Sequence, residues 1–168
     1  QVECASRGYE GKKNAHLFSL SLHDFLKHYN AVPRRVVWVV AAALLNDKGE
    51  LLMAERPADT NMPGVWELPG GKMELGETPE QALIRELKEE LYIEVKEEDL
   101  EPFCFVSYRY DLFHLVMPIY VCRKWEGIPH GAEGQRVEWS TYANLARMPL
   151  PPADIIPAHR LADLLNLK

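Results

Sequence analysis

Three acidic residues that lie close together in the sequence carry the clearest chemical signal in this chain. On a helix, Glu86, Glu89 and Glu90 share an arc of about 100°. Like charges at this spacing repel one another by roughly 0.2–0.5 kcal/mol per pair. A divalent cation would offset that repulsion, and clustered carboxylate oxygens suit Mg²⁺ or Mn²⁺. The helix pattern alone leaves a solvated acidic face as the alternative, because acids are frequent throughout residues 86–101.

The residues that precede this helix favour the metal site. Gly70 and Gly71 end a segment rich in proline and glycine, and Glu77 lies just before the predicted helix start. Arg85 is placed to bridge to Glu89 one turn later. Carboxylates beside a glycine-rich turn form a hard-oxygen site, which could bind an ion that screens a polyphosphate.

The helix itself has a well-defined start. Thr78 is a suitable N-cap, Pro79 suits the first helical position, and Gln81 completes a capping box. An apolar stripe on the same helix is predicted to face the core, and it consists of Leu83, Ile84, Leu87 and Leu91.

The elements around the helix indicate α/β layers, with helices covering a mixed sheet. Residues 36–45 form an apolar run that is typical of a strand buried on both faces. Turn-forming residues 46–49 should join this strand to a second one at 50–55 in a hairpin, and 57–72 should form a long shaped loop. Further strands are predicted at 103–110, 114–123 and 137–140, a loop at 126–135 and a closing helix at 153–165. Trp38, Trp125 and Trp139 are expected to be core or loop-anchoring groups.

Composition restricts the class of partner. The chain has 168 residues, 47% of them hydrophobic and 26% charged, which is typical of a globular domain. Its formal net charge of -6 disfavours binding to a nucleic-acid polymer, which usually requires a basic face. A small phosphorylated ligand remains compatible with this charge, provided that a bound metal neutralises the phosphates.

Cysteine content and hydropathy predict a cytoplasmic protein with no membrane partner. The three cysteines show no CxxC spacing, which favours a reducing compartment. The longest apolar run, residues 36–45, has half the length of about 20 residues that a membrane-spanning helix needs. Residues 1–32 are expected to be an N-terminal extension, disordered or non-native, with a short amphipathic helix as an alternative at 17–29. Residues 33–168 are expected to be the functional domain.

Residues 71–93 resemble the Nudix box. That pattern consists of Gly, five residues, Glu, seven residues, and then Arg-Glu-apolar-any-Glu-Glu-any-Gly-apolar. Gly71, Glu77, Arg85 and the three glutamates all match it. The one departure is Tyr92, which occupies the position of the second Gly and raises a question about the backbone where the helix ends.

The resemblance extends over about residues 36–165 and, within the Nudix hydrolases, is to the MutT branch. The segments that carry it are 55–59 (ERPAD), 66–72 (WELPGGK), 125–127 (WEG), 131–135 (GAEGQ) followed by Trp139, and 151–154 (PPAD). It implies a Nudix-type α/β/α sandwich with a mixed sheet. It also implies hydrolysis of oxidised purine nucleoside triphosphates, 8-oxo-dGTP to 8-oxo-dGMP and pyrophosphate, with Mg²⁺ or Mn²⁺. The expected partner is a small-molecule nucleotide, and a monomer is favoured.

The resemblance also implies roles for individual residues. The ions would be held by the Gly70 carbonyl, Glu86, Glu89, Glu90 and Glu133. Glu86 would receive the proton of the attacking water. Glu133 would be a further metal or base carboxylate, or else a plain loop acid.

Other residues would bind the substrate or support the ligands. Lys72 would reach a phosphate oxygen, while Glu77 and Arg85 would support the metal ligands, with Arg85 orienting the carboxylates. The nucleotide pocket would be lined by Arg56, Asn61, Glu67, Leu68, Pro69, Gly70, Tyr110 and Asp154. For Tyr110, ordinary burial in a strand is equally compatible with the sequence.

Asp154 leaves the preferred base open. MutT proteins commonly have Asn at this position, where the amide donates to O6 and accepts from the N7–H of 8-oxoguanine. A carboxylate cannot donate, so Asp154 must be protonated or must accept from ring donors. A cytosine amino group would also satisfy it, so the alternatives are cytidine or other nucleoside triphosphates, or a nucleoside diphosphate sugar. A non-catalytic Nudix ligand-binding module is a further alternative, although no box carboxylate is missing.

Overall fold

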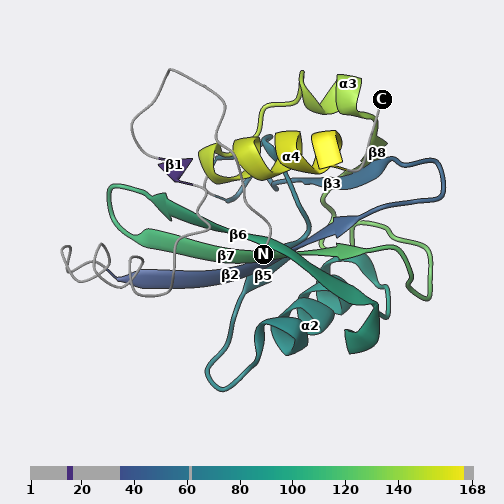
Figure 1. Ribbon diagram of the computed structural model, residues 1–168, viewed down its shortest axis with the longest axis horizontal. Coiled ribbons are helices and arrows are strands. Elements are labelled where there is room, and N and C mark those ends of the chain that lie inside the picture. The colour runs from purple at the N-terminus through teal and green to yellow at the C-terminus, as the bar shows by residue number, and fades with distance from the viewer. Residues whose placement is uncertain (1–14, 17–34, 61, 165–168) are drawn as a thin grey trace.

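Two β-sheets form the framework of the protein, and helices cover them from opposite sides (Figure 1). The computed structural model describes residues 15–16, 35–60 and 62–164. The larger sheet contains, in spatial order, β1 (Ala15–His16), β6 (Leu100–Arg109), β7 (His114–Cys122), β2 (Val36–Leu44) and β5 (Gly70–Lys72). The smaller sheet contains β4 (Trp66–Glu67), β3 (Leu51–Glu55) and β8 (Val137–Ser140). The helices are α2 (Pro79–Leu91), the 3₁₀ turn η1 (Glu97–Asp99), α3 (Tyr142–Leu145) and α4 (Pro152–Leu164).

The larger sheet is mixed, as predicted. β2 runs parallel to β7, whereas β5, β6 and β1 each pair antiparallel with their neighbours. α2 lies on one side of this sheet and α4 on the other (Figure 1). The predicted α/β/α sandwich is therefore confirmed.

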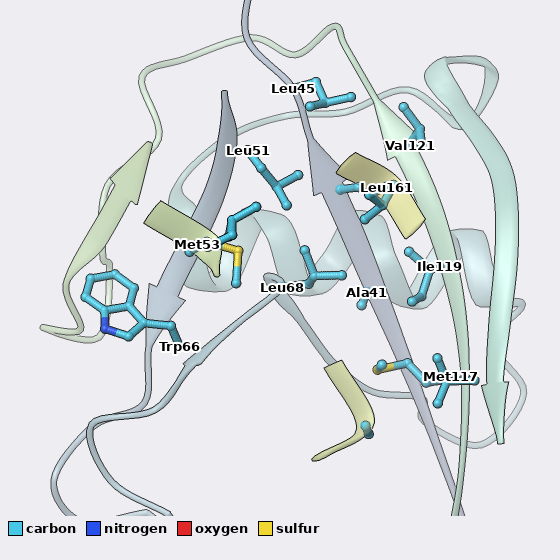
Figure 2. Close-up of a cluster of buried hydrophobic side chains, with 14 of the residues drawn as sticks. Ala41, Leu45, Leu51, Met53, Trp66, Leu68, Met117, Ile119, Val121 and Leu161 are labelled. Carbon is cyan, nitrogen blue, oxygen red and sulfur yellow. The ribbon is translucent and has the colours of Figure 1, made fainter. Parts of the chain in front are cut away.

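β2 runs through the centre of the molecule and is buried on both faces over its second half. Val40, Ala42 and Leu44 belong to the apolar cluster beneath α2, which includes Leu83, Leu87 and Leu91 of that helix. Ala41 and Ala43 belong to the opposite cluster, which includes residues of β3, β7 and α4. Figure 2 shows this second cluster, in which Leu51 and Met53 of β3 lie near Leu68. Because alternate side chains of a strand point to opposite faces, one apolar run supplies both cores.

The prediction of a hairpin formed by β2 and β3 is wrong, because the two strands belong to different sheets. The turn at residues 46–49 forms, and the Asn46 side chain accepts hydrogen bonds from the backbone N–H groups of Lys48 and Glu50. A single isolated bridge, Leu45 to Leu51, then joins the two strands. β3 pairs instead with β4 and β8, because β7 and β5 already occupy both hydrogen-bonding edges of β2.

The prediction of one long loop at 57–72 is also wrong for its second half, which contains β4 and β5. β5 pairs with β2 through Gly70 opposite Ala41 and Gly71 opposite Val40. Gly70 has φ 146°, and a Cβ at this position would overlap the Val40 carbonyl. Glycine is depleted in strands in general, so a strand at this position is not visible from local propensity.

Both ends of α2 are well defined. The capping box between Thr78 and Gln81 is present, as predicted. At the other end Tyr92 adopts the left-handed conformation (φ 55°, ψ 34°) that the family's glycine would adopt more readily. Its ring stacks on His130 with the centroids 4.9 Å apart. The helix therefore ends in a left-handed C-cap even though Tyr92 replaces the family's glycine.

The remaining strands and the closing helix lie within a few residues of their predicted positions. Trp125 and Trp139 stack on each other, but Trp38 is 48% exposed, so the prediction that it belongs to the core is wrong. Of residues 1–32 the structure describes only Ala15–His16, which pairs as β1 with Ser107 and Tyr108. The alternative of a helix at 17–29 lies outside the described residues.

Candidate active site

The acidic face of α2 lies directly against β5. The backbone N–H of Gly70 donates to the Glu90 carboxylate at 3.1 Å. A Cβ on Gly71 would overlap the carboxylate of Glu86. The two glycines therefore allow Glu86 and Glu90 to approach the backbone of β5, the edge strand of the larger sheet.

Arg85 organises the side of this cluster nearest the helix start. Its guanidinium donates to both oxygens of Glu77, at 2.7 and 3.0 Å, and to the carbonyl of Lys72 at 3.0 Å. It also donates to Glu86 at 2.8 Å and to Glu89 at 3.2 Å. Hydrogen bonds from Arg85 lower the pKa of Glu77 to about 2, and those carboxylates raise the pKa of Arg85. A planar fork that binds three carboxylates restricts their orientation.

At the side of the cluster nearest the helix end, several acidic groups crowd around Glu90. Burial, and after it the nearby carboxylates of Glu67, Glu86 and Glu133, raise the pKa of Glu90 to about 8. The Gly70 N–H opposes this shift only partly. Burial also raises the pKa of Glu86, despite the pairing with Arg85. Crowded acids of this kind are typical of a site that is completed by a cation.

The donor set fits a hard divalent cation. Glu86 and Glu90, the two partly buried acids next to the glycines, are the residues that could hold one, and Glu133 contributes negative charge beside them. Glu89 is exposed and pairs with Arg85. In the part of the chain that the structure describes, no three His, Cys, Asp or Glu side chains stand close enough together to form a ready-made metal cluster.

A second group of polar residues surrounds Asp154 in the first turn of α4. Asp154 is buried and accepts a hydrogen bond from the backbone N–H of Leu68. Burial raises its pKa to about 7, the charge of Glu67 adds to this, and Arg56 opposes it. The start of α4 is held near β4 because the Trp66 N–H donates to the carbonyl of Pro149 at 2.8 Å.

Tyr110 forms an aromatic wall beside Asp154. It follows the end of β6 and packs against Phe113 and Tyr108, with ring centroids 4.8 and 4.7 Å apart. Burial raises the pKa of Tyr110 to about 12, the Asp154 charge contributes, and the Ala153 N–H opposes the shift by hydrogen bonding. Tyr110 therefore lies at the edge of this group and not within a strand.

Glu67 links the two groups. Its carboxylate pairs with Arg56 at 2.8 Å, and burial raises its pKa. Its charge raises the pKa of both Glu90 and Asp154, so it lies close to each. The short segment from Glu67 to Gly70 thus connects the acidic cluster to the group of residues around the buried Asp154.

The other residues singled out from the sequence are distributed around this segment. Leu68 and Pro69 are buried, and the Pro69 carbonyl accepts from the Ala42 N–H at 2.8 Å. The side chain of Lys72 is exposed at the end of β5. Asn61 lies outside the described residues.

Gln135 is a site residue that the sequence analysis missed. Its side chain donates to the carbonyl of Glu90 at 3.1 Å and accepts from the N–H of Glu133 at 2.8 Å. The only sequence signal was an amide two residues after the loop acid Glu133, and its partner on α2 is far away in the chain.

Comparison with known proteins agrees with this geometry. The NUDIX domain family matches residues 35–163, and the chain therefore belongs to the Nudix hydrolase family. Within that family it resembles the MutT branch. It is 37% identical over 116 residues to the 8-oxo-dGTP diphosphatase of Escherichia coli K12, covering 69% of this chain and 88% of the relative. It is 33% identical over 118 residues to the CTP pyrophosphohydrolase of the same organism, covering 69% and 84%.

Solved structures show the same likeness. A MutT structure from work on Aliivibrio salmonicida and Vibrio cholerae superposes with a TM-score of 0.67 at 32% identity, covering 77% of this chain and 99% of that one. The E. coli ORF135 protein superposes with a TM-score of 0.68 at 32% identity, covering 78% and 91%. The family generally uses divalent cations. None of the described helices has the length and apolarity required to span a bilayer.

Proposed function

We propose that this protein is a Mg²⁺-dependent pyrophosphohydrolase that cleaves 8-oxo-dGTP to 8-oxo-dGMP and pyrophosphate. The observation that carries the proposal is that one short segment contacts both groups: the Gly70 N–H donates to Glu90 at 3.1 Å, and the Leu68 N–H donates to Asp154. A triphosphate over the acids and a base beside Asp154 would be joined across the segment from Glu67 to Gly70. The relatives named 8-oxo-dGTP diphosphatase support this assignment.

The acidic cluster would carry the chemistry. A divalent cation, when bound, neutralises phosphate oxygens and lowers the barrier to attack by water. In this proposal Gly70, Glu86, Glu89, Glu90 and Glu133 hold the metal. The water oxygen bonds to phosphorus, the phosphoanhydride P–O bond breaks, and the water proton passes to Glu86. Burial raises the pKa of Glu86, which makes its carboxylate a stronger proton acceptor. Lys72, exposed on β5, would bind a phosphate oxygen.

The group of residues around Asp154 would select the base. With a pKa of about 7, Asp154 is neutral in a substantial fraction of molecules at neutral pH. A neutral carboxyl offers an O–H donor for O6 and a carbonyl acceptor for the N7–H of 8-oxoguanine, the same pattern as an amide. Unmodified guanine has no N7–H and would leave that buried acceptor unpaired, which costs about 1–3 kcal/mol. Tyr110 would pack against the base.

Hydrolysis of a cytidine triphosphate is the second candidate. An ionised Asp154 accepts hydrogen bonds only, and a cytosine amino group would satisfy it. The similarity to a CTP pyrophosphohydrolase supports this alternative.

A nucleotide panel separates the two candidates. Turnover of 8-oxo-dGTP, dGTP, CTP, dCTP and a nucleoside diphosphate sugar would be compared by kcat/KM with Mg²⁺, and products would be identified by mass. We expect 8-oxo-dGTP to be preferred over dGTP with pyrophosphate released, whereas equal use of the two would refute the proposal. Such an activity, placed in the cytoplasm, would remove oxidised precursors before replication.

A further inference from the structure

The segment at residues 130–135 closes the C-terminal end of α2. The last carbonyl groups of a helix have no partner within the helix. Here the Leu91 carbonyl accepts from the His130 N–H at 3.2 Å, and the Glu90 carbonyl accepts from the Ala132 N–H at 2.9 Å. The side chain of Gln135 donates to the same Glu90 carbonyl at 3.1 Å. One exposed loop is thereby attached to the residue that stands at the centre of the acidic cluster.

The Gln135 amide connects this attachment to Glu133. Its oxygen accepts from the Glu133 N–H at 2.8 Å, while its nitrogen reaches the Glu90 carbonyl. The Gln135 amide supplies both the donor and the acceptor that this bridge needs, and it does so without a charge. The loop is shaped around it, since a Cβ on Gly131 would overlap the Gln135 carbonyl. Beyond Gln135 the Arg136 carbonyl accepts from the Glu55 N–H at 2.8 Å, which attaches the segment to β3.

Without such an attachment, the Glu133 carboxylate would move away from the cluster. Glu133 is exposed, and its charge lies close enough to Glu90 to raise the pKa of that residue. Two like charges repel, and an exposed loop gains conformational entropy when it is released. The contacts that can hold the loop to Glu90 against this repulsion are the bond from the Ala132 N–H and the Gln135 bridge, and of these two only the bridge also fixes the backbone of Glu133 itself.

We infer that Gln135 is a positioning residue, which holds the Glu133 carboxylate beside Glu90 by linking the backbones of the two residues. The inference rests on the proposed function, in which Glu133 is a metal or base carboxylate. The two hydrogen bonds of the Gln135 side chain go to the backbone of Glu133 and Glu90, so in this role Gln135 acts through Glu133.

A double-mutant cycle in the 168-residue chain tests this inference. Gln135→Ala, Glu133→Ala and the double variant would be compared for kcat with 8-oxo-dGTP, and for Mn²⁺ affinity without nucleotide by electron paramagnetic resonance. Because residues that orient metal ligands typically contribute 10–100-fold, we expect Gln135→Ala to lower kcat and Mn²⁺ affinity by about tenfold. In the Glu133→Ala background the same substitution should change either quantity less than about twofold. Equal effects in the two backgrounds would overturn the inference.

Two further variants separate positioning from stability. Gln135→Glu keeps the acceptor for the Glu133 N–H but loses the donor to Glu90, so it should recover part of the Gln135→Ala loss at most. Gln81→Ala is the matched control, because Gln81 also bonds to a backbone N–H, that of Thr78, at the other end of α2. It should lower the unfolding midpoint to a similar extent and leave kcat and Mn²⁺ affinity unchanged. A parallel loss of kcat in Gln81→Ala would count against the inference.

The Mn²⁺ measurement also separates the inference from the proposed function. If no nucleotide of the panel is hydrolysed but the Mn²⁺ cycle shows coupling, the proposed substrate is wrong and the role of Gln135 stands. If 8-oxo-dGTP is hydrolysed but the cycle is additive, the role of Gln135 is wrong and the proposed function stands.

Discussion

Glu90 and Asp154 meet the same physical difficulty in two different surroundings. Burial raises the pKa of each carboxyl, to about 8 for Glu90 and about 7 for Asp154. Each accepts one backbone hydrogen bond, from Gly70 and Leu68 respectively, and that bond does not compensate for the loss of solvent.

The neighbours of these two carboxyls differ. Around Glu90 the nearby charges that affect its pKa are all acidic, whereas the pKa of Asp154 is affected by the paired charges of Glu67 and Arg56. Several acids together are best stabilised by a cation, which cancels all of their charges at once. A single buried carboxyl is stabilised by a proton or by a donor on a ligand. The first region therefore suits phosphate chemistry and the second suits recognition of a base.

The largest expected effect is at the acidic cluster of Glu86, Glu89 and Glu90, which we call the cation region. Glu86→Gln removes the proposed base and one ligand charge, so kcat should fall by about 100-fold or more on every substrate used. Glu98→Gln, an exposed acid on η1, is the matched control and should retain full turnover in the same steady-state assay. If Glu86→Gln lowered kcat for only one substrate of the panel, Glu86 would affect selectivity. The assignment of turnover to the acidic cluster and of base selection to the group around Asp154 would then be wrong.

The second region, around Asp154, should affect how the free energy of unfolding depends on pH. In the unfolded chain the pKa of Asp154 is about 3.8, whereas burial in the folded protein raises it to about 7. The folded state therefore binds more protons between these values, and its stability falls as pH rises through this window. We expect Asp154→Asn to remove about 2 kcal/mol of that fall between pH 5 and 8 in urea unfolding. Asp163→Asn, an exposed position in the same helix, should keep the wild-type slope.

A smaller effect is expected where the cation region meets β5. Gly71→Ala would place a methyl group against the Glu86 carboxylate and displace it. We expect about tenfold weaker Mg²⁺ activation with little change in KM for the nucleotide at saturating metal. Gly76→Ala is the comparison, since it has φ 91° but no atom within 4 Å of the added Cβ. It should reduce stability through backbone strain while Mg²⁺ activation stays normal, and a metal defect in Gly76→Ala would contradict the steric explanation.

The smallest effect should occur outside both regions, at the end of α2. Tyr92→Gly relieves a left-handed tyrosine, worth about 1 kcal/mol, and loses the stack on His130, worth about 0.5 kcal/mol. Chemical denaturation should show a gain of about 0.5 kcal/mol with kcat unchanged. Lys88→Gly, inside the same helix, should instead lose about 1 kcal/mol. A changed kcat in Tyr92→Gly would show that the end of α2 beyond Glu90 also influences catalysis.

Features that depend on near neighbours in the chain were predictable. The capping box of Thr78 and Gln81 and the buried stripe of Leu83, Leu87 and Leu91 follow from helical spacing and are present. The strand at residues 36–45 was predictable because its apolar run is long and rich in valine at its start. What failed was pairing: nothing in residues 46–55 shows that both edges of β2 are already occupied by β5 and β7.

The sequence by itself determined that Glu86, Glu89 and Glu90 lie on one arc of a helix, because helical geometry depends on spacing alone. Only the tertiary structure brought Glu67 near both Glu90 and Asp154, and Gln135 onto the Glu90 carbonyl. These contacts join residues far apart in the chain, and they depend on burial between β4, β5, α2 and α4. The raised pKa values have the same origin, because loss of solvent around a carboxyl is a property of the packed molecule and not of its neighbours in sequence.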